Sequence, residues 1–113
     1  MQNFLGQDGR QIVRDEAILS TATYNSPAID IQSFKGYSVQ ANITAGGAIT
    51  GTFKLQCTND GTNWVDVADS ERSITAVGVL MLNVAEAYYD KFRAVYISTS
   101  GAITLNLYIQ AKG

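Results

Sequence analysis

Apolar and polar residues alternate along much of the chain with a period of two. The alternation is clearest in residues 37–44, 52–58 and 103–110, where apolar side chains occupy every second position and mostly polar side chains lie between them. A period of two places one face of a strand in a core and the other in solvent. These segments therefore predict three half-buried antiparallel strands.

Further strands are predicted where β-branched and aromatic residues gather in short runs. The segments are Arg10–Arg14, Ala17–Thr23, Ala28–Gln32, Trp64–Ala68, Arg72–Val77, Val79–Val84 and Lys91–Thr99. Turn residues separate them at Gly46-Gly47, Asn59-Asp60-Gly61 and Ser100-Gly101. Residues 84–89 favour at most one helical turn, and we interpret them as a loop. Turns that recur every ~8–14 residues are typical of a β-sandwich or barrel.

The fold class predicted is all-β: an antiparallel, jelly-roll-like β-sandwich of about eight strands. A length of 113 residues suits one domain. Residues 1–16 show no clean period and contain the apolar pair Phe4-Leu5. We therefore divide the chain into an irregular N-terminal arm, residues 1–16, and a β-sandwich domain, residues 17–113.

The charge distribution argues against nucleic acid and membrane partners. The chain carries 8 Lys and Arg against 10 Asp and Glu, and the basic residues are scattered singly. The sequence therefore offers no cluster of basic residues that would bind a phosphate backbone or an anionic membrane. No N-terminal signal sequence and no apolar run of transmembrane length are present, so we expect synthesis in the cytosol.

Candidate chemistry is sparse, and we expect no enzyme, no cofactor and no metal. The chain contains no histidine, which removes the commonest general base and transition-metal ligand. Its single cysteine, Cys57, continues the alternation of Phe53 and Leu55 and is predicted to be a small buried side chain. No two carboxylates stand out as a catalytic pair.

The Asn59–Asn63 segment has the oxygen-rich look of a calcium loop. It lacks the further carboxylates and terminal Glu of an EF-hand, so a β-turn is the preferred interpretation. A minor alternative is an ion shared by Asp60 with the downstream acids Asp66, Asp69 and Glu71.

Exposed aromatic rings would suit sugar stacking. We expect Trp64, which follows a turn and precedes Val65, to pack in the core, with exposure as the alternative. Tyr108 lies opposite the aliphatic face of its strand and is the better candidate for an exposed ring. Of the adjacent Tyr88 and Tyr89, one is expected to face solvent or a partner.

Residues 51–67 read GTFKLQCTNDGTNWVDV and follow the alternating strand at residues 37–43. Together with a closing pair at residues 91–97 and 103–107, this stretch resembles small β-sandwich proteins of bacteriophage particles, of the head-decoration (cement) type and related jelly-roll domains. The likeness covers roughly residues 37–110. The residues that carry it are structural, and no functional site transfers with them.

The resemblance implies a non-enzymatic capsid decoration protein that binds the major capsid protein and stabilises the particle. It would be a homo-oligomer, a dimer or a trimer, on the capsid exterior of a virion assembled in the host cytoplasm. Phe4 and Leu5 are the expected partner-binding anchors of the arm, and Ile12 and Val13 would add a strand to a neighbour's sheet edge. The equal alternative is that these four residues cover the core of their own domain and bind no partner.

Two other functions stay open. The chain could be a carbohydrate- or receptor-binding module of a phage fibre or tail, which exposed aromatic rings would support. A different virion role, as a coat, spike or tail-tube subunit, is the third alternative.

Overall fold

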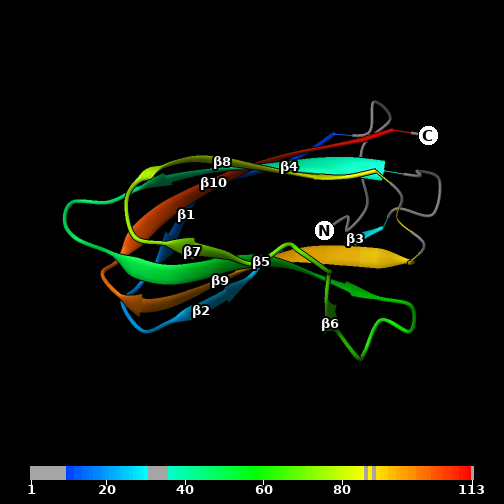
Figure 1. Cartoon of the computed structure of the whole chain (residues 1–113), viewed down its shortest axis with the longest axis horizontal. Coiled ribbons are helices and arrows are strands. Elements are labelled where there is room, and N and C mark those ends of the chain that lie inside the picture. Colours follow the sequence, from blue (N-terminus) through cyan, green and yellow to red (C-terminus); the bar gives the residue numbers. More distant parts are fainter. Residues whose placement is uncertain (1–9, 31–35, 86, 88, 113) are drawn as a thin grey trace.

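The computed structural model describes residues 10–30, 36–85, 87 and 89–112. These residues form two antiparallel sheets that pack face to face, with no helix among them (Figure 1). The strands are β1 (Arg10–Ile18), β2 (Thr23–Asn25), β3 (Ile29–Asp30), β4 (Gly36–Thr44), β5 (Thr50–Thr58), β6 (Val65–Asp66), β7 (Arg72–Ile74), β8 (Gly78–Val84), β9 (Lys91–Ser100) and β10 (Ile103–Lys112). The predicted all-β sandwich is confirmed. No helix within the described ranges is long and apolar enough to cross a membrane.

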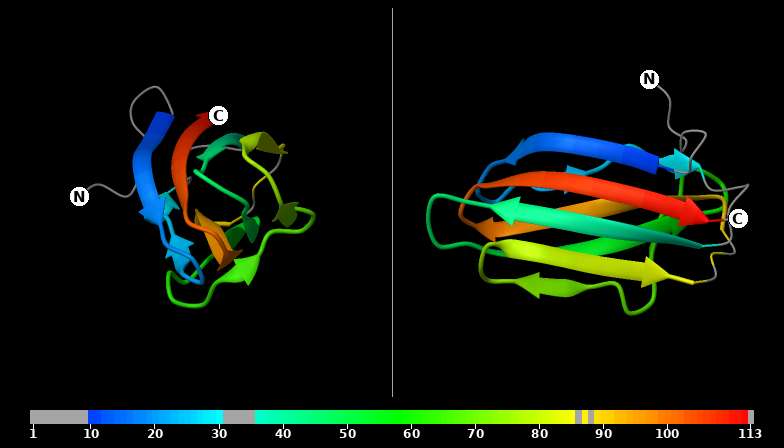
Figure 2. Two further views of the ribbon diagram at one scale, coloured as in Figure 1. Left: turned by 90° about the vertical axis from the view of Figure 1, so that its left-hand side faces the viewer. Right: turned by 90° about the horizontal axis from the view of Figure 1, so that it is seen from above.

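The strand order identifies the sandwich as a jelly roll. One sheet has the order β1-β10-β4-β8, and Figure 2 shows these four strands side by side from above. The other has the order β2-β9-β5-β6, with β3 also paired to β9 and β7 also paired to β5. When β2 with β3 and β6 with β7 are each counted as one position, successive positions cross between the sheets except from β5 to β6–β7. This is the connectivity of two interleaved Greek keys.

Ten strands occupy eight positions, as predicted. β2 and β3 lie end to end along β9, and β6 and β7 lie end to end along β5, so each pair is one interrupted strand. At both interruptions a buried serine replaces a missing strand partner. In the first, the backbone N–H of Ala94 donates to Ser26 Oγ at 2.8 Å, and the N–H of Ser26 donates to the Ala94 carbonyl oxygen at 2.8 Å.

The core fills the space between the sheets with the alternate side chains of the four longest inner strands. β4 contributes Tyr37, Val39, Ala41 and Ile43, β10 contributes Ile103, Leu105, Leu107 and Ile109, β5 contributes Phe53, Leu55 and Cys57, and β9 contributes Phe92, Ala94 and Tyr96. Each of these side chains is at most 9% exposed, so the predicted inward faces and the buried Cys57 are confirmed.

One close approach in the core requires a glycine. A Cβ atom added at Gly51 of β5 would overlap the hydroxyl end of Tyr96 and lie 2.8 Å from the carbonyl oxygen of Ile97. Glycine at this position therefore leaves the space that the fully buried Tyr96 ring occupies.

The strand predicted at Arg10–Arg14 is part of a longer strand of the sandwich. β1 starts at Arg10 and pairs with β10, so residues 10–16 belong to the sandwich and the boundary drawn at residue 17 falls within this strand. A bulge between Val13 and Glu16 interrupts the register of β1, which explains why no clean alternation is visible in its sequence.

Candidate functional site

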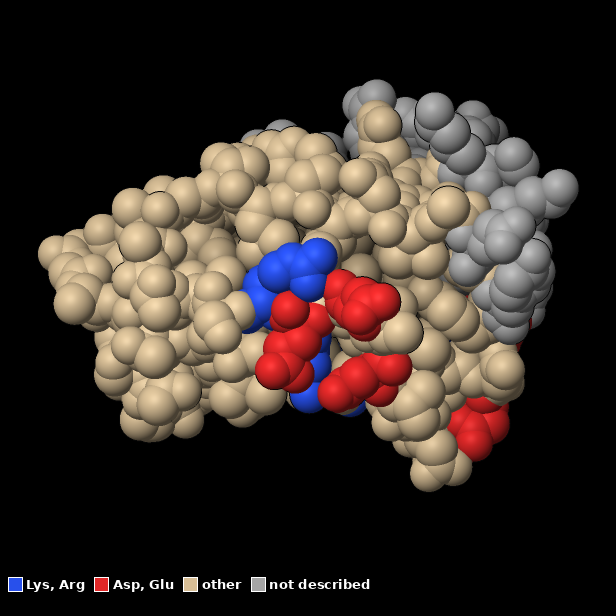
Figure 3. Space-filling view, viewed as in Figure 1, with Lys and Arg blue, Asp and Glu red and all other residues tan. Residues whose placement is uncertain are grey.

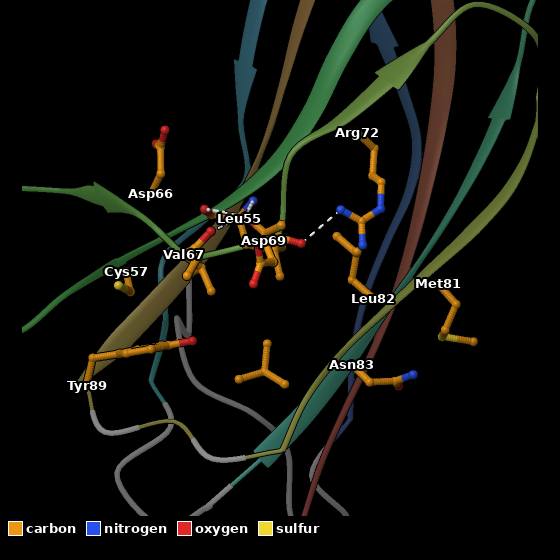
Figure 4. Close-up of a pocket in the computed structure, with 13 residues that line it drawn as sticks. Leu55, Cys57, Asp66, Val67, Asp69, Arg72, Met81, Leu82, Asn83 and Tyr89 are labelled. Atoms are coloured by element: carbon orange, nitrogen blue, oxygen red, sulfur yellow. Dashed lines mark hydrogen bonds between the residues drawn. The ribbon is translucent and has the colours of Figure 1, made fainter.

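A cleft runs along one open side of the sandwich. It lies between β8, the edge of one sheet, and the β6–β7 connection at the edge of the other, and its volume is about 700 Å³. We call it the edge cleft. Its lining residues are Leu55, Cys57, Asp66, Val67, Ala68, Asp69, Ser70, Arg72, Met81, Leu82, Asn83, Val84 and Tyr89 (Figure 4).

One wall of the edge cleft is held by the second interrupting serine. Ser70 is 4% exposed, and its hydroxyl accepts a hydrogen bond from the Leu55 N–H at 3.1 Å and donates to the Val67 carbonyl oxygen at 2.7 Å. The Val67 N–H donates to the Leu55 carbonyl oxygen at 2.9 Å. These bonds tie the β6–β7 connection to β5 and fix the shape of the wall.

The same wall carries a strained residue. Asp69 has a φ of 59°, in the left-handed region that non-glycine residues seldom adopt. The Arg72 guanidinium donates to the carbonyl oxygen of Asp69 at 2.8 Å (Figure 4) and to that of Glu71 at 2.9 Å. These bonds hold this backbone in place. Both Asp69 and Arg72 therefore have a structural task at the rim.

The rim of the edge cleft is charged and carries both signs. Figure 3 shows acidic and basic side chains gathered near the middle of this face, whereas the surrounding visible surface is largely uncharged. On the β6 side, Asp66 accepts hydrogen bonds from Lys54 Nζ at 3.2 Å and from Gln56 Nε2 at 3.0 Å. These two bonds lower the pKa of the Asp66 carboxyl, with the larger contribution from Gln56, so it is anionic at neutral pH.

One end of the edge cleft is aromatic, opposite the end that Arg72 occupies (Figure 4). The hydroxyls of Tyr89 and Tyr37 lie 2.7 Å apart, and the Tyr37 ring stacks on Phe92 with centroids 3.8 Å apart. Burial raises the pKa of both tyrosines, and burial, aided by Asp66, raises the pKa of the neighbouring Cys57 thiol. A raised pKa keeps the thiol protonated, which suits a packing role rather than a nucleophile.

The core position expected for Trp64 is wrong. Its ring is only partly buried and lies against the Arg93 guanidinium, whose central carbon is 4.3 Å from the ring centroid. Arg93 donates two hydrogen bonds to Gln56 Oε1, at 3.0 and 2.8 Å, and Gln56 in turn bonds Asp66. A polar row thus runs from Trp64 across the outer face of β9 and β5 to the rim of the edge cleft.

The other aromatic candidates are less prominent. Tyr108 is partly buried on the outer face of its sheet, where it pairs with Gln40 of β4. Tyr89 is partly buried at the end of the edge cleft, and Tyr88 lies outside the described residues.

The Asp60 loop is a turn that its own carboxylate holds together. Asp60 Oδ1 accepts hydrogen bonds from the backbone N–H groups of Thr62 and Asn63, both at 2.8 Å, and from the Thr58 hydroxyl at 2.9 Å. Asp60 Oδ2 accepts from Asn63 Nδ2 at 2.8 Å. These bonds, above all those from Asn63, lower the pKa of Asp60. Both oxygens are thus engaged within the turn. No group of three or more potential ligand side chains that could hold a metal occurs in the described ranges.

The predicted arm anchors divide into two groups. Phe4 and Leu5 lie outside the described residues. Ile12 and Val13 lie in β1, where their backbone positions pair with Tyr108 and Leu107 of the same chain's β10. β1 is the last strand of its sheet, so its outer edge is the one that a neighbour's strand would meet.

Sequence reasoning missed β8 as a surface. Val79 is 66% exposed and Met81 is 51% exposed, and Val77 just before the strand is 53% exposed. They are three of the five large apolar residues that are exposed in the described part of the chain. The sequence offered a sign of this in the run GVLMLNV, which is apolar at successive positions and therefore apolar on both faces.

No protein-family model and no curated protein sequence matches this chain. Solved structures do match. The exported protein XepA of PBSX is 14% identical with a TM-score of 0.75 over 92% of this chain, which spans 37% of the XepA chain. The prophage-derived protein YomS of SPBc2 is 12% identical with a TM-score of 0.59, over 91% of this chain and 93% of YomS.

Carbohydrate-binding modules share the fold as well. The C-terminal family 6 module of LamC from Zobellia galactanivorans is 14% identical with a TM-score of 0.52, over 90% of this chain and 88% of that module. At such identities the similarity shows the fold alone, because one fold hosts many functions. The chain is a jelly-roll β-sandwich that resembles small phage-derived β-sandwich proteins.

Proposed function

We propose that this chain is a non-enzymatic structural protein of a bacteriophage virion, a decoration or cement protein that binds the major capsid lattice and stabilises the particle. The observation that carries the proposal is the edge strand β8, whose exposed apolar side chains Val79 and Met81 give a rigid sandwich a surface for assembly. The phage origin of XepA and YomS supports the same direction.

The polar groups of the surface also favour architecture over catalysis. The Asp60 carboxylate closes a turn, the Arg72 guanidinium holds a backbone, and Arg93 lies against Trp64. Groups engaged in this way stabilise the loops of the sandwich. The proposed location is the outside of the capsid, with assembly in the host cytoplasm and the major capsid protein as the partner.

The test adds the purified protein to shells that lack it. A protein that binds only the intact shell raises the temperature at which the shell breaks down, by mass action. We expect sedimentation with shells and a higher disruption temperature that saturates with added protein. A Phe4→Ala, Leu5→Ala variant tests the predicted arm, and Leu19→Ala, at a 71% exposed apolar residue elsewhere, is its control. Absence of shell binding by the unaltered protein would contradict the proposal.

A second candidate is a carbohydrate- or receptor-binding module of a fibre or tail. The specific observation in its favour is the edge cleft, which combines the ring of Tyr89 with hydrogen-bonding groups of Asp66 and Asn83 and adjoins the polar row of Trp64. Small-molecule sites in proteins combine aromatic or apolar lining with a few hydrogen-bonding groups. Binding on a glycan array that Tyr89→Ala or Asn83→Ala abolishes would support it, and a blank array would count against it.

A further inference from the structure

Three of the four outer strand positions in the sandwich are interrupted. β1 carries a bulge between Val13 and Glu16 and four charged residues in its sequence. The β2–β3 position is broken at Ser26-Pro27, and the β6–β7 position is broken by the connection that Ser70 holds. Bulges, charges, prolines and short edge strands prevent a sheet from pairing with another molecule.

β8 has none of these protections. It pairs with β4 over seven consecutive positions, from Gly78 to Val84, without a register shift. Its sequence, GVLMLNV, contains no charge and no proline. It is the last strand of its sheet, so its outer edge presents unpaired backbone groups beside the edge cleft. A continuous, uncharged edge of this length is a surface for strand addition.

We propose that β8 pairs antiparallel with β8 of a second copy about a two-fold axis at Met81, joining two four-stranded sheets into one of eight. The inference deepens the proposed function, since it rests on the chain being an assembly subunit and names the surface through which copies join. A two-fold contact uses the same patch on both partners, so the strand must be complementary to itself.

β8 meets this condition along its length. Pairing centred on Met81 sets Met81 against the partner's Met81, Val79 against the partner's Asn83 and Leu80 against the partner's Leu82. In each of these pairs the two residue numbers are both odd or both even. Side chains point to alternate faces along a strand, so paired side chains lie on the same face of the joined sheet. Leu82 is buried and Leu80 is partly buried against the core, so the inner contacts would extend that core between copies.

Charge also favours a second copy as the occupant. A strand that carried a charge near its centre would meet the same charge across the axis, and like charges opposite each other destabilise a sheet. The edge cleft beside β8 is rimmed by both signs (Figure 3), with Asp66, Asp69 and Arg72 among its lining residues. Neither copy therefore presents a field of one sign that repels the other.

The first test places a charge at the axis. Met81→Lys should convert a dimer into a monomer, measured by light scattering after size exclusion and by sedimentation equilibrium across a wide concentration range. Met81 is 51% exposed, so the fold should tolerate lysine, and circular dichroism with an unfolding curve checks that it does. The matched control is Leu19→Lys, the same kind of change at a 71% exposed residue away from β8, which should remain dimeric.

The second test uses the fact that, at the proposed axis, Met81 of one copy faces Met81 of the other. Mixing the Met81→Lys and Met81→Glu variants should restore a dimer that neither forms alone, since opposite charges then face each other. A Met81→Cys variant should form an intermolecular disulfide under mild oxidation, because directly paired residues in an antiparallel sheet have Cα atoms ~4.5–5.5 Å apart, within disulfide range. Leu19→Cys is the control that should not.

Several results would overturn the inference. These are a wild-type monomer at every concentration, a ring of three or more copies, or a dimer that survives Met81→Lys. Shell binding is scored separately. If shells bind the protein while no β8 dimer exists, the β8 dimer is contradicted and the proposed function stands. If a β8 dimer forms but does not bind shells, the proposed function is contradicted and the β8 dimer stands.

Discussion

At the scale of single residues, the Tyr96 hydroxyl is the least satisfied polar group in the described core. The side chain is fully buried, and no hydrogen-bond partner for its oxygen occurs among the residues described. A buried hydroxyl without a partner keeps the cost of its lost hydration. We expect Tyr96→Phe to raise the free energy of unfolding by about 1 kcal/mol, measured by chemical denaturation.

Tyr37→Phe is the opposing control for this prediction. The Tyr37 hydroxyl lies 2.7 Å from that of Tyr89, so its removal breaks a hydrogen bond and should lower stability. A loss of stability in Tyr96→Phe as well would mean that the Tyr96 hydroxyl has a partner after all, such as a buried water.

Gly51 is predicted to be intolerant of even one extra carbon. A Cβ there would overlap Tyr96 and approach the Ile97 carbonyl oxygen, which belongs to the paired strand and cannot retreat freely. We expect Gly51→Ala to reduce the free energy of unfolding by ~1–3 kcal/mol, the range for overpacked cores. Gly46→Ala, where a Cβ would meet nothing within 4 Å, serves as the control in the same denaturation assay. Equal stability of the two variants would contradict the prediction.

Trp64 shows how a residue can be misread although its sequence context held the answer. In a strand, Trp64 and Asp66 share one face, and Val65 and Val67 share the other. Asp66 pairs with Gln56, whose side chain faces outward, so Trp64 belongs on the outer face with Arg93. Size and hydrophobicity favoured the core, but alternation decided the face.

At the scale of elements, the interrupted strands depend on their serines. Ser70→Ala would leave the buried Leu55 N–H without its acceptor and release the β6–β7 connection. We expect a loss of ~1–3 kcal/mol in the free energy of unfolding, the cost of an unsatisfied buried donor. Ser73→Ala, at an exposed serine of β7, should change stability little in the same measurement. A neutral Ser70→Ala would show that water replaces the hydroxyl.

The turn between β5 and β6 should make stability depend on pH. The folded state lowers the pKa of Asp60, so its contribution is complete above the ordinary aspartate value of about 4 and is lost as the pH falls below it. Asp60→Asn, which cannot ionise, should therefore show a shallower loss of unfolding midpoint between neutral and acidic pH. Some slope should remain, because the pKa of Asp66 is lowered too. An unchanged slope would contradict the role of Asp60.

The long strands were predictable, β8 and β9 among them, whereas the bounds of the short, interrupted strands were not. β4, β5 and β10 follow the predicted segments closely because their alternation is a direct record of burial. β2 and β3 were harder, since Ser26 rather than a strand residue completes their pairing with β9. The start of β1 at Arg10 was predicted, but its continuation past Arg14 to Ile18 was not, because the bulge between Val13 and Glu16 shifts the alternation in mid-strand.

At the scale of the whole molecule, the edge cleft and the four strand edges arise only when distant segments meet. Residues 66–72 and 81–84 form opposite walls of the cleft, yet no local pattern links them. The exposure of Val79 likewise depends on β8 being the last strand of its sheet. The fold class could be predicted from the sequence, whereas the candidate surface needed the order of the strands.

A dimer formed through β8 has a consequence for thermal unfolding. When the folded protein is a dimer and the unfolded chain is a monomer, mass action raises the midpoint temperature as protein concentration rises. We therefore expect the midpoint of the wild-type protein to increase across a dilution series followed by scanning calorimetry. Met81→Lys, which places like charges at the two-fold axis, should give a midpoint independent of concentration, and Leu19→Lys should behave as the wild type does. A wild-type midpoint that stays constant would mean that the folded protein is a monomer and that β8 does not pair with a second copy.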